Sequence, residues 1–420
     1  MSAVQERRAG RGDAASRLFR EVIARAGDQP VALNALGLHA MAQGDFAESA
    51  ALLRRAIAAD PNSPDLWMNL AKARREQRDD PGEEEALQGA LAIDQRHFMA
   101  LVRMAELFER GGNASSAAER WRGVLAMAPM IEERSPALEL MLEHARNYVA
   151  RQREGFAGTI DRGLEAARRD VAPAGLRRFD ACIDHALGRR EIYANHCAGM
   201  HFPFLPADEF FSREHFPWLE TIEAQADVIR AELEAVLAED SAAIRPYVAM
   251  APGTPTNKWS PLDHSLEWGA MHLWKDGRRD EAVCARVPRT AAAVEALPLS
   301  DLPGRTPTVF FSLLRPGAHL PAHTGVSNVR TIIHVPLIVP PGCTFRVGGE
   351  TRAWQAGKAW AFDDTIEHEA WNRSDQMRAI LIFDVWNPHI TPVERDLLRR
   401  FYAVAATAGD SPEDAISLSE

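Results

Sequence analysis

The sequence has few cysteines and no long apolar segment. Its 420 residues include four cysteines, and none of them forms a CxxC pair. This pattern excludes a disulfide scaffold and a zinc ribbon. No run approaches the roughly 18 consecutive apolar residues that a membrane-spanning helix needs, and the first residues lack the apolar core of a secretory signal. We therefore expect a cytoplasmic protein that does not act in a membrane.

The sequence also lacks a surplus of positive charge. Its formal net charge is -11, which argues against a nucleic-acid partner because such a partner requires a basic footprint. The apolar fraction of 46% and the charged fraction of 25% are typical of a globular protein. The length favours two domains over one.

A pattern of 34 residues repeats in the N-terminal third, with repeats that start at Pro30, Pro64 and Phe98. Apolar and small residues recur in register, namely Leu36, Leu70 and Met104, and Gly37, Ala71 and Ala105. This pattern resembles the tetratricopeptide repeat, although Arg78 and Gln95 interrupt the middle copy. We expect an all-α solenoid over residues 1–170, capped by helices over 14–27 and 131–170. It either holds a peptide or protein partner or only packs against the rest of the chain.

Residues 171–420 have a different period. After a helical run over 220–240, short segments rich in β-branched and aromatic residues alternate with Pro and Gly: "TVFFSLL", "RTIIHVPLIV", "TFRVGG", "KAWAFDD" and "RAILIFDVW". Such segments predict a β-sandwich or a jelly roll. Of the two we expect the double-stranded β-helix, the jelly roll of cupin-like proteins, with flanking helices. The predicted fold class is therefore α+β multidomain, with a helical-repeat solenoid followed by this domain.

Two histidines of the second half are candidate metal ligands. His323 follows one predicted strand and His368 precedes another, so the two can meet at the mouth of a jelly roll. Fe(II) favours imidazole and carboxylate ligands, yet Gly325 occupies the position two residues after the first histidine, where a carboxylate is usual. Each histidine alone is also compatible with a surface or hydrogen-bonded role. His319 is a fallback ligand, and a carboxylate could also come from Asp363 or Asp364.

Arg378 opens a predicted strand ten residues after His368. A buried guanidinium there needs a carboxylate, and 2-oxoglutarate offers one at its far end, which an arginine can bind in a bidentate manner. A structural ion pair with Asp363, Asp364 or Asp384 is the equal alternative.

The residues from about Trp268 to Pro388 resemble the catalytic domain of the aspartyl/asparaginyl β-hydroxylase family. The stretches that carry the resemblance include "FSLLRPGAHLPAHTGVSNVR", "FDDTIEHEAWN" and "RAILIFDVWNP". Members are dioxygenases that use Fe(II), 2-oxoglutarate and O2. In this family two histidines alone hold the metal, so the glycine at 325 would be the family pattern and the matching ligands are His323 and His368.

The resemblance also implies roles for five other residues. Arg378 and Ser312 would hold the far carboxylate of 2-oxoglutarate, His334 would contact the carboxylate beside its keto group, and Trp268 would line the same pocket. Arg330 matches an arginine that pairs with the acidic side chain of the substrate. One departure is Ile332, whose position is basic in the animal enzymes.

The resemblance implies hydroxylation of the β-carbon of Asp or Asn, with release of succinate and CO2. The repeats favour a peptide or protein substrate, held by the repeat domain. Two alternatives stay open: hydroxylation of a free amino acid or another small carboxylate, and a repeat scaffold that binds a metal or acid without turnover.

Overall fold

A computed structural model describes residues 3–239 and 243–408. The chain divides into two compact units, Met1–Asp180 and Ala181–Glu420. The sequence-based boundary, residue 170, lies at the C-terminal end of the long helix α9 (Pro136–Arg169).

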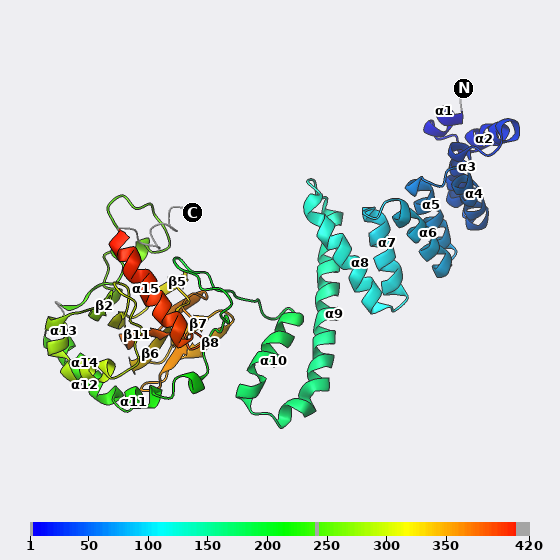
Figure 1. Ribbon diagram of the computed structural model, residues 1–420. Coiled ribbons are helices and arrows are strands. Elements are labelled where there is room, and N and C mark those ends of the chain that lie inside the picture. Colours follow the sequence, from blue (N-terminus) through cyan, green and yellow to red (C-terminus); the bar gives the residue numbers. More distant parts are fainter. Residues whose placement is uncertain (1–2, 240–242, 409–420) are drawn as a thin grey trace. The chain divides into compact units, whose positions relative to one another are not determined.

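The first unit is helical throughout (Figure 1). Its repeats are helix pairs, and the sequence-based starts at Pro30, Pro64 and Phe98 are each the first residue of a helix. The helices that precede α9 are α1 (Ala3–Arg8), α2 (Gly12–Ala26), α3 (Pro30–Ala42), α4 (Phe46–Ala59), α5 (Pro64–Glu76), α6 (Asp80–Ile93), α7 (Phe98–Arg110) and α8 (Ala114–Met127). The predicted all-α repeat architecture of this part is thus confirmed.

The in-register residues of the repeats hold each helix pair together. Leu36, Leu70 and Met104 are all buried. A side chain on Gly37 would put its Cβ 2.9 Å from Leu53 Cγ, so a small residue is required where the helices approach. A second periodic signal lies at the start of each following helix, where one side chain caps the backbone: Asp45, Asp79 and Asn113.

Arg78 marks the irregular middle repeat. It has a φ of 58°, whereas the equivalent positions carry glycines, Gly44 with φ 81° and Gly112 with φ 73°. The turn between the paired helices therefore requires a left-handed residue, which the middle repeat supplies with an arginine.

The second unit contains two β-sheets. The larger sheet has the order β1-β2-β4-β11-β6-β9 with β3 on β2, and the smaller has the order β5-β10-β7-β8. The strands are β1 (Arg245–Pro246), β2 (Trp268–Lys275), β3 (Arg278–Arg279), β4 (Val309–Leu314), β5 (His319–His323), β6 (Arg330–Ile338), β7 (Cys343–Val347), β8 (Glu350–Ala353), β9 (Trp360–Phe362), β10 (His368–Asn372) and β11 (Arg378–Trp386). Each of the five quoted segments contains a strand, and neighbouring strands of the larger sheet are antiparallel.

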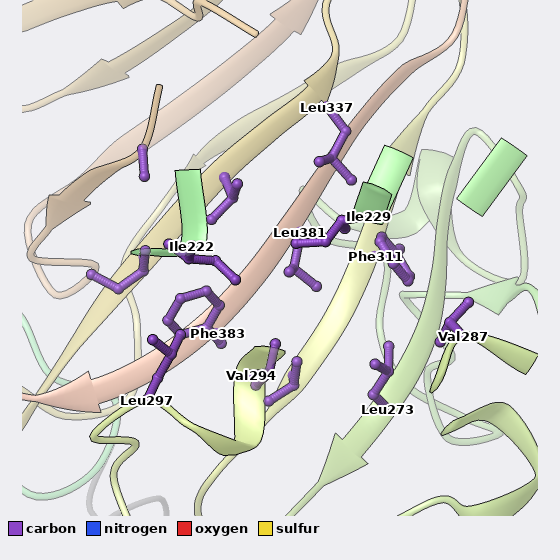
Figure 2. Packing of buried hydrophobic residues seen from close by; sticks show 14 of the residues in the cluster. Ile222, Ile229, Leu273, Val287, Val294, Leu297, Phe311, Leu337, Leu381 and Phe383 are labelled. Carbon is purple, nitrogen blue, oxygen red and sulfur yellow. The ribbon is translucent and has the colours of Figure 1, made fainter. Parts of the chain in front are cut away.

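Helices cover one face of the larger sheet. They are α11 (Leu219–Glu223), α12 (Ala226–Glu239), α13 (Glu281–Arg286) and α14 (Pro288–Glu295). Two further helices are α10 (Pro173–Ala186), which crosses the boundary between the units, and α15 (Pro392–Ala408). Ile222 and Ile229 pack on Phe311, Leu381 and neighbouring side chains in one apolar cluster (Figure 2). The predicted helical run over 220–240 is divided into α11 and α12.

The other face of the larger sheet points toward the smaller sheet. Because side chains alternate along a strand, Phe311 and Leu313 face the helices whereas Ser312 and Leu314 face the smaller sheet. The same alternation sends Ile380 toward the smaller sheet, where a second apolar cluster joins the sheets. The site described below lies on this inner face.

Within residues 3–239 and 243–408, no helix combines the length and apolar character that crossing a bilayer requires.

Candidate active site

Two histidines come together at adjacent strands of the smaller sheet. His323 ends β5 and His368 begins β10, the two residues are partners in the strand register, and their ring centroids lie 4.0 Å apart. The sequence-based prediction that these distant histidines can meet is therefore matched by the structure.

Backbone carbonyls fix the tautomer of both rings. His323 Nδ1 donates to Pro321 O at 2.7 Å, and His368 Nδ1 donates to Ile366 O at 3.0 Å. Burial lowers the pKa of His323 to about 3, with His368 adding to the shift, and burial lowers the pKa of His368 to about 4. Each ring is consequently neutral near pH 7 and keeps the lone pair of Nε2, which is the state that binds a metal ion.

Arg378 is a buried cation without a carboxylate partner. Its residue is 1% exposed, and its Nη1 donates to the carbonyl and the hydroxyl of Ser312 at 3.4 and 3.3 Å. Among the described residues no Asp or Glu pairs with it, and its Nε has no hydrogen-bond partner. Burial lowers the pKa of this guanidinium to about 9. The alternative of a structural ion pair is therefore wrong: the nearby aspartates have other partners.

Those aspartates are engaged elsewhere. Asp363 accepts from Asn195 Nδ2 at 2.7 Å and from Thr365 Oγ1 at 2.6 Å, so it ties the segment before the sheets to the end of β9. Asp384 accepts from Thr308 N at 2.9 Å and pairs with Arg330 at 3.0 Å.

The hydroxyl of Ser312 links the guanidinium to Trp268. Ser312 Oγ accepts hydrogen bonds from Trp268 Nε1 at 3.0 Å and from Arg378 Nη1. Since the hydroxyl oxygen already accepts from two donors, its own proton is available to an acceptor in the pocket.

His334 lies on β6, two strands away from Ser312 in the larger sheet. It is 5% exposed and its Nδ1 has no hydrogen-bond partner among the described residues. Burial lowers the pKa of His334 well below its usual value, and the charge of Arg378 and the ring of His368 add to this shift. A neutral imidazole with an unused nitrogen therefore faces the same space.

All seven residues predicted from the sequence line one cavity of about 560 Å³ between the two sheets. They are Trp268, Ser312, His323, Arg330, His334, His368 and Arg378. Buried polar groups without partners are costly, so a cavity with an unpaired guanidinium and an unpaired imidazole nitrogen suits a small, polar, anionic ligand.

Asp364 occupies the space in which a side chain at position 325 would lie. A Cβ built on Gly325 would be 2.1 Å from Asp364 Oδ2, and Gly325 N donates to the carbonyl of Asp364 at 2.6 Å. Glycine is thus required at this position because the neighbouring carboxylate fills it. Asp364 Oδ1 has no hydrogen-bond partner among the described residues.

His319 is not placed as the fallback ligand requires. It bonds to Glu369 at 2.7 Å and stacks on Trp371, and its side chain is 45% exposed. The pairing of β5 with β10 shifts register between His368 and Ala370, which changes the face on which the start of β5 presents its side chains. This irregularity explains why two histidines four residues apart do not share one face.

Two aromatic residues of the site were missed by the sequence reasoning. Tyr247 stacks on Trp268 with ring centroids 3.7 Å apart, and Trp259 contacts both Trp268 and His323. Both belong to the segment between β1 and β2, whose only signal is its content of Pro and aromatic residues. The segment closes one side of the cavity.

Among residues 3–239 and 243–408, no group of three or more His, Cys, Asp and Glu side chains is arranged to hold a metal ion. His323 and His368 form the adjacent pair of neutral imidazoles in the cavity, and the carboxylate of Asp364 interacts with His323.

Two family models match parts of this chain. Residues 223–388 match the family model described as "Aspartyl/Asparaginyl beta-hydroxylase", and residues 2–64 and 34–97 match a tetratricopeptide-repeat model. The first of these matches lies wholly within the second unit, which is therefore similar to this family. All seven predicted site residues lie within the residues that match the first model.

Several curated proteins are similar to parts of this unit. The aspartyl/asparaginyl beta-hydroxylase of Mus musculus is 39% identical over 141 residues, which are 32% of this chain and 19% of that protein. The ornithine lipid ester-linked acyl 2-hydroxylase of Rhizobium tropici is 37% identical over 180 residues, which are 42% of this chain and 60% of that protein. The matches therefore span about a fifth of the mouse protein and three fifths of the bacterial one.

Proposed function

We propose that the second unit is an Fe(II)- and 2-oxoglutarate-dependent dioxygenase that hydroxylates the β-carbon of an Asp or Asn residue in a polypeptide. The observation that carries the proposal is the buried Arg378, which has no carboxylate partner, in the same cavity as two neutral histidines. A dicarboxylate that chelates a metal at one end and pairs with a guanidinium at the other fits both features.

The strand order supports the same proposal. From β4 to β11 the chain passes between the two sheets so that β4, β6, β9 and β11 belong to the larger sheet and β5, β7, β8 and β10 to the smaller. We assign this arrangement to the double-stranded β-helix, with the metal site between the sheets.

The residues divide the work of binding between them. His323 and His368 would hold the iron through Nε2, which leaves other coordination positions open for 2-oxoglutarate and O2. When bound, the iron and 2-oxoglutarate supply the oxidation of an unactivated C–H bond, with release of succinate and CO2. Arg378 and the hydroxyl group of Ser312 would donate to the far carboxylate of 2-oxoglutarate, and His334 would donate to the carboxylate beside its keto group. Trp268 and its stacked neighbours exclude water from this side.

The repeat unit would hold the polypeptide. Its helices α3, α5 and α7 carry a polar ladder in which Asn69 donates to Asn34 at 2.9 Å and Arg103 donates to the carbonyl of Met68 at 3.2 Å. Amide and guanidinium groups of this kind can bind an extended peptide backbone, which supports a peptide substrate over a free amino acid.

The test is binding and turnover of 2-oxoglutarate by the full chain. Calorimetry with Mn(II) in place of Fe(II) should give 2-oxoglutarate binding that requires the metal, and Fe(II) with O2 should give slow succinate formation without added substrate. His368→Gln should abolish both, whereas His319→Gln, a matched change outside the cavity on the neighbouring strand, should alter neither. Metal-independent binding, or no binding at all, would overturn the cosubstrate assignment.

A further inference from the structure

The arginine beside the metal histidines already has carboxylate neighbours within the protein. Arg330 Nη1 lies 3.0 Å from Asp384 Oδ2, and its Nη2 lies 3.7 Å from Asp364 Oδ2. Both aspartates are buried, and the arginine side chain is 18% exposed. One cation therefore has two carboxylate neighbours, and it donates a hydrogen bond to Asp384, whereas its Nε has no hydrogen-bond partner among the described residues.

The strand residues of the larger sheet next to this cluster add no positive charge, and Lys258, on the side of His323, donates to the carbonyl of Ala322 at 2.9 Å. Phe310 and Ile382 are register partners on β4 and β11, and Ile332 is the register partner of Asp384 on β6. All three line the cavity. The remaining lysine and arginine residues of the lining are Lys275 at the exposed end of β2, Arg305 in the loop before β4, and Arg378. Under the proposed function the last of these is engaged by 2-oxoglutarate.

We propose that the substrate side chain seated beside the metal histidines is uncharged, so that within a polypeptide the enzyme acts on Asn in preference to Asp. This inference rests on the proposed function and names the side chain that it left open. An incoming carboxylate would be a third anion around a single guanidinium beside two buried aspartates, and like charges brought together there are strongly unfavourable. Discrimination then arises from repulsion of the acid as well as from attraction of the amide.

An amide also satisfies the groups that are present. Its oxygen can accept from the guanidinium of Arg330, as a carboxylate oxygen does. Its NH2 can in addition donate to Asp364, whose Oδ1 has no hydrogen-bond partner among the described residues. A carboxylate has no proton to donate near pH 7 and would leave that oxygen without a partner.

The experiment compares probes that differ only in charge. Two peptides, identical except for Asn or Asp at the central position, are supplied with Fe(II) and saturating 2-oxoglutarate. A second pair, octanamide and octanoate, carries the same difference in charge on an acyl chain. The stimulation of succinate formation and the hydroxylated product are measured. The neutral member of at least one pair should be used about tenfold or more efficiently. Equal use of both members, preference for the acids, or no response to any neutral probe would overturn the inference.

Substitutions in the cluster around Arg330 test whether charge causes the preference for Asn over Asp. Asp384→Asn removes one of the two carboxylates and should raise use of the Asp peptide until the preference is lost. Ile332→Lys adds a cation at the register partner of Asp384 without removing any buried ion pair, and it should act in the same direction. Asp276→Asn makes the same chemical change at an exposed position of the lining and should leave the ratio of Asn to Asp use unchanged. If neither Asp384→Asn nor Ile332→Lys moves the ratio in folded protein, charge balance is not its origin.

Failure of this inference can be told apart from failure of the proposed function. Binding of 2-oxoglutarate to the metal-loaded protein and succinate formation without substrate test the latter and involve no probe. An enzyme that passes both tests and prefers the Asp peptide would keep its proposed function and lose only the selectivity argued here.

Discussion

The two faces of the larger sheet are built from alternate residues of the same strands, yet the inner face carries the polar and charged groups of the site. On the face toward the helices, Phe311, Leu313 and Leu381 are buried among other apolar side chains. On the inner face lie Ser312, between Phe311 and Leu313, and the guanidinium of Arg378, which has no carboxylate partner among the described residues. The first face stabilises the unit, and the second retains costly unpaired polar groups that a ligand can satisfy. Substitutions at neighbouring positions should therefore separate stability from binding.

Arg378→Met should show the largest difference between an effect on 2-oxoglutarate binding and an effect on stability. Removal of the cation should weaken 2-oxoglutarate binding by about a hundredfold or more, because charge-assisted pairing with the carboxylate is lost. The thermal stability of the protein without ligand should not fall, since an unpaired buried charge is replaced by an apolar side chain of similar length. Calorimetry gives the affinity and differential scanning fluorimetry the stability. A strongly destabilised variant would show that the guanidinium is structural.

Leu381→Ala, on the same strand, should have the opposite result: it should lower stability and leave 2-oxoglutarate binding unchanged. Leu381 is fully buried against α12 and its neighbours (Figure 2), and truncation of such a leucine costs about 2 to 5 kcal/mol of unfolding free energy. The KM for 2-oxoglutarate of the folded fraction should stay within about twofold of the wild type, as remote sites usually behave independently. Urea unfolding and initial rates measure the two quantities. A large rise in KM without loss of stability would contradict the division between the faces.

Much of this division could be predicted from the sequence, because alternation within "RAILIFDVW" already separates Arg378 from its apolar neighbours. The spacing of 34 residues likewise predicted the helix pairs, since every repeat reuses the same local contacts. The position of His319 could not be predicted, because it depends on a register shift against β10 that only strand pairing reveals. Tyr247 and Trp259 were missed for a related reason: their contacts with Trp268 join segments whose pairing no local pattern specifies.

The stability of the second unit should depend on pH through His272, which lies at the edge of the inner face. Burial lowers the pKa of this ring to about 4, and it stacks on Phe310. Below its ordinary pKa of about 6.5 the unfolded chain binds a proton that the folded chain does not, so stability is lost as the pH falls from about 6.5 to about 4. His272→Phe removes this contribution, and its unfolding free energy relative to the wild type should rise by about 2 kcal/mol between pH 8 and pH 4.5. Urea unfolding at both pH values measures it, and an equal effect at both would contradict the assignment.

The smallest effect on the inner face should come from Ser312→Ala. The hydroxyl receives Trp268 Nε1 and Arg378 Nη1, and its proton is available to the far carboxylate of 2-oxoglutarate. Loss of one hydrogen bond of this kind costs about 1 kcal/mol, so the KM for 2-oxoglutarate should rise by roughly three- to tenfold while kcat changes little. Leu313→Ala, one residue away on the other face, is the matched control: it should lower stability and leave the KM unchanged. If the serine variant instead leaves the KM unaltered, the hydroxyl only positions the guanidinium, and the carboxylate is bound by Arg378 without its help.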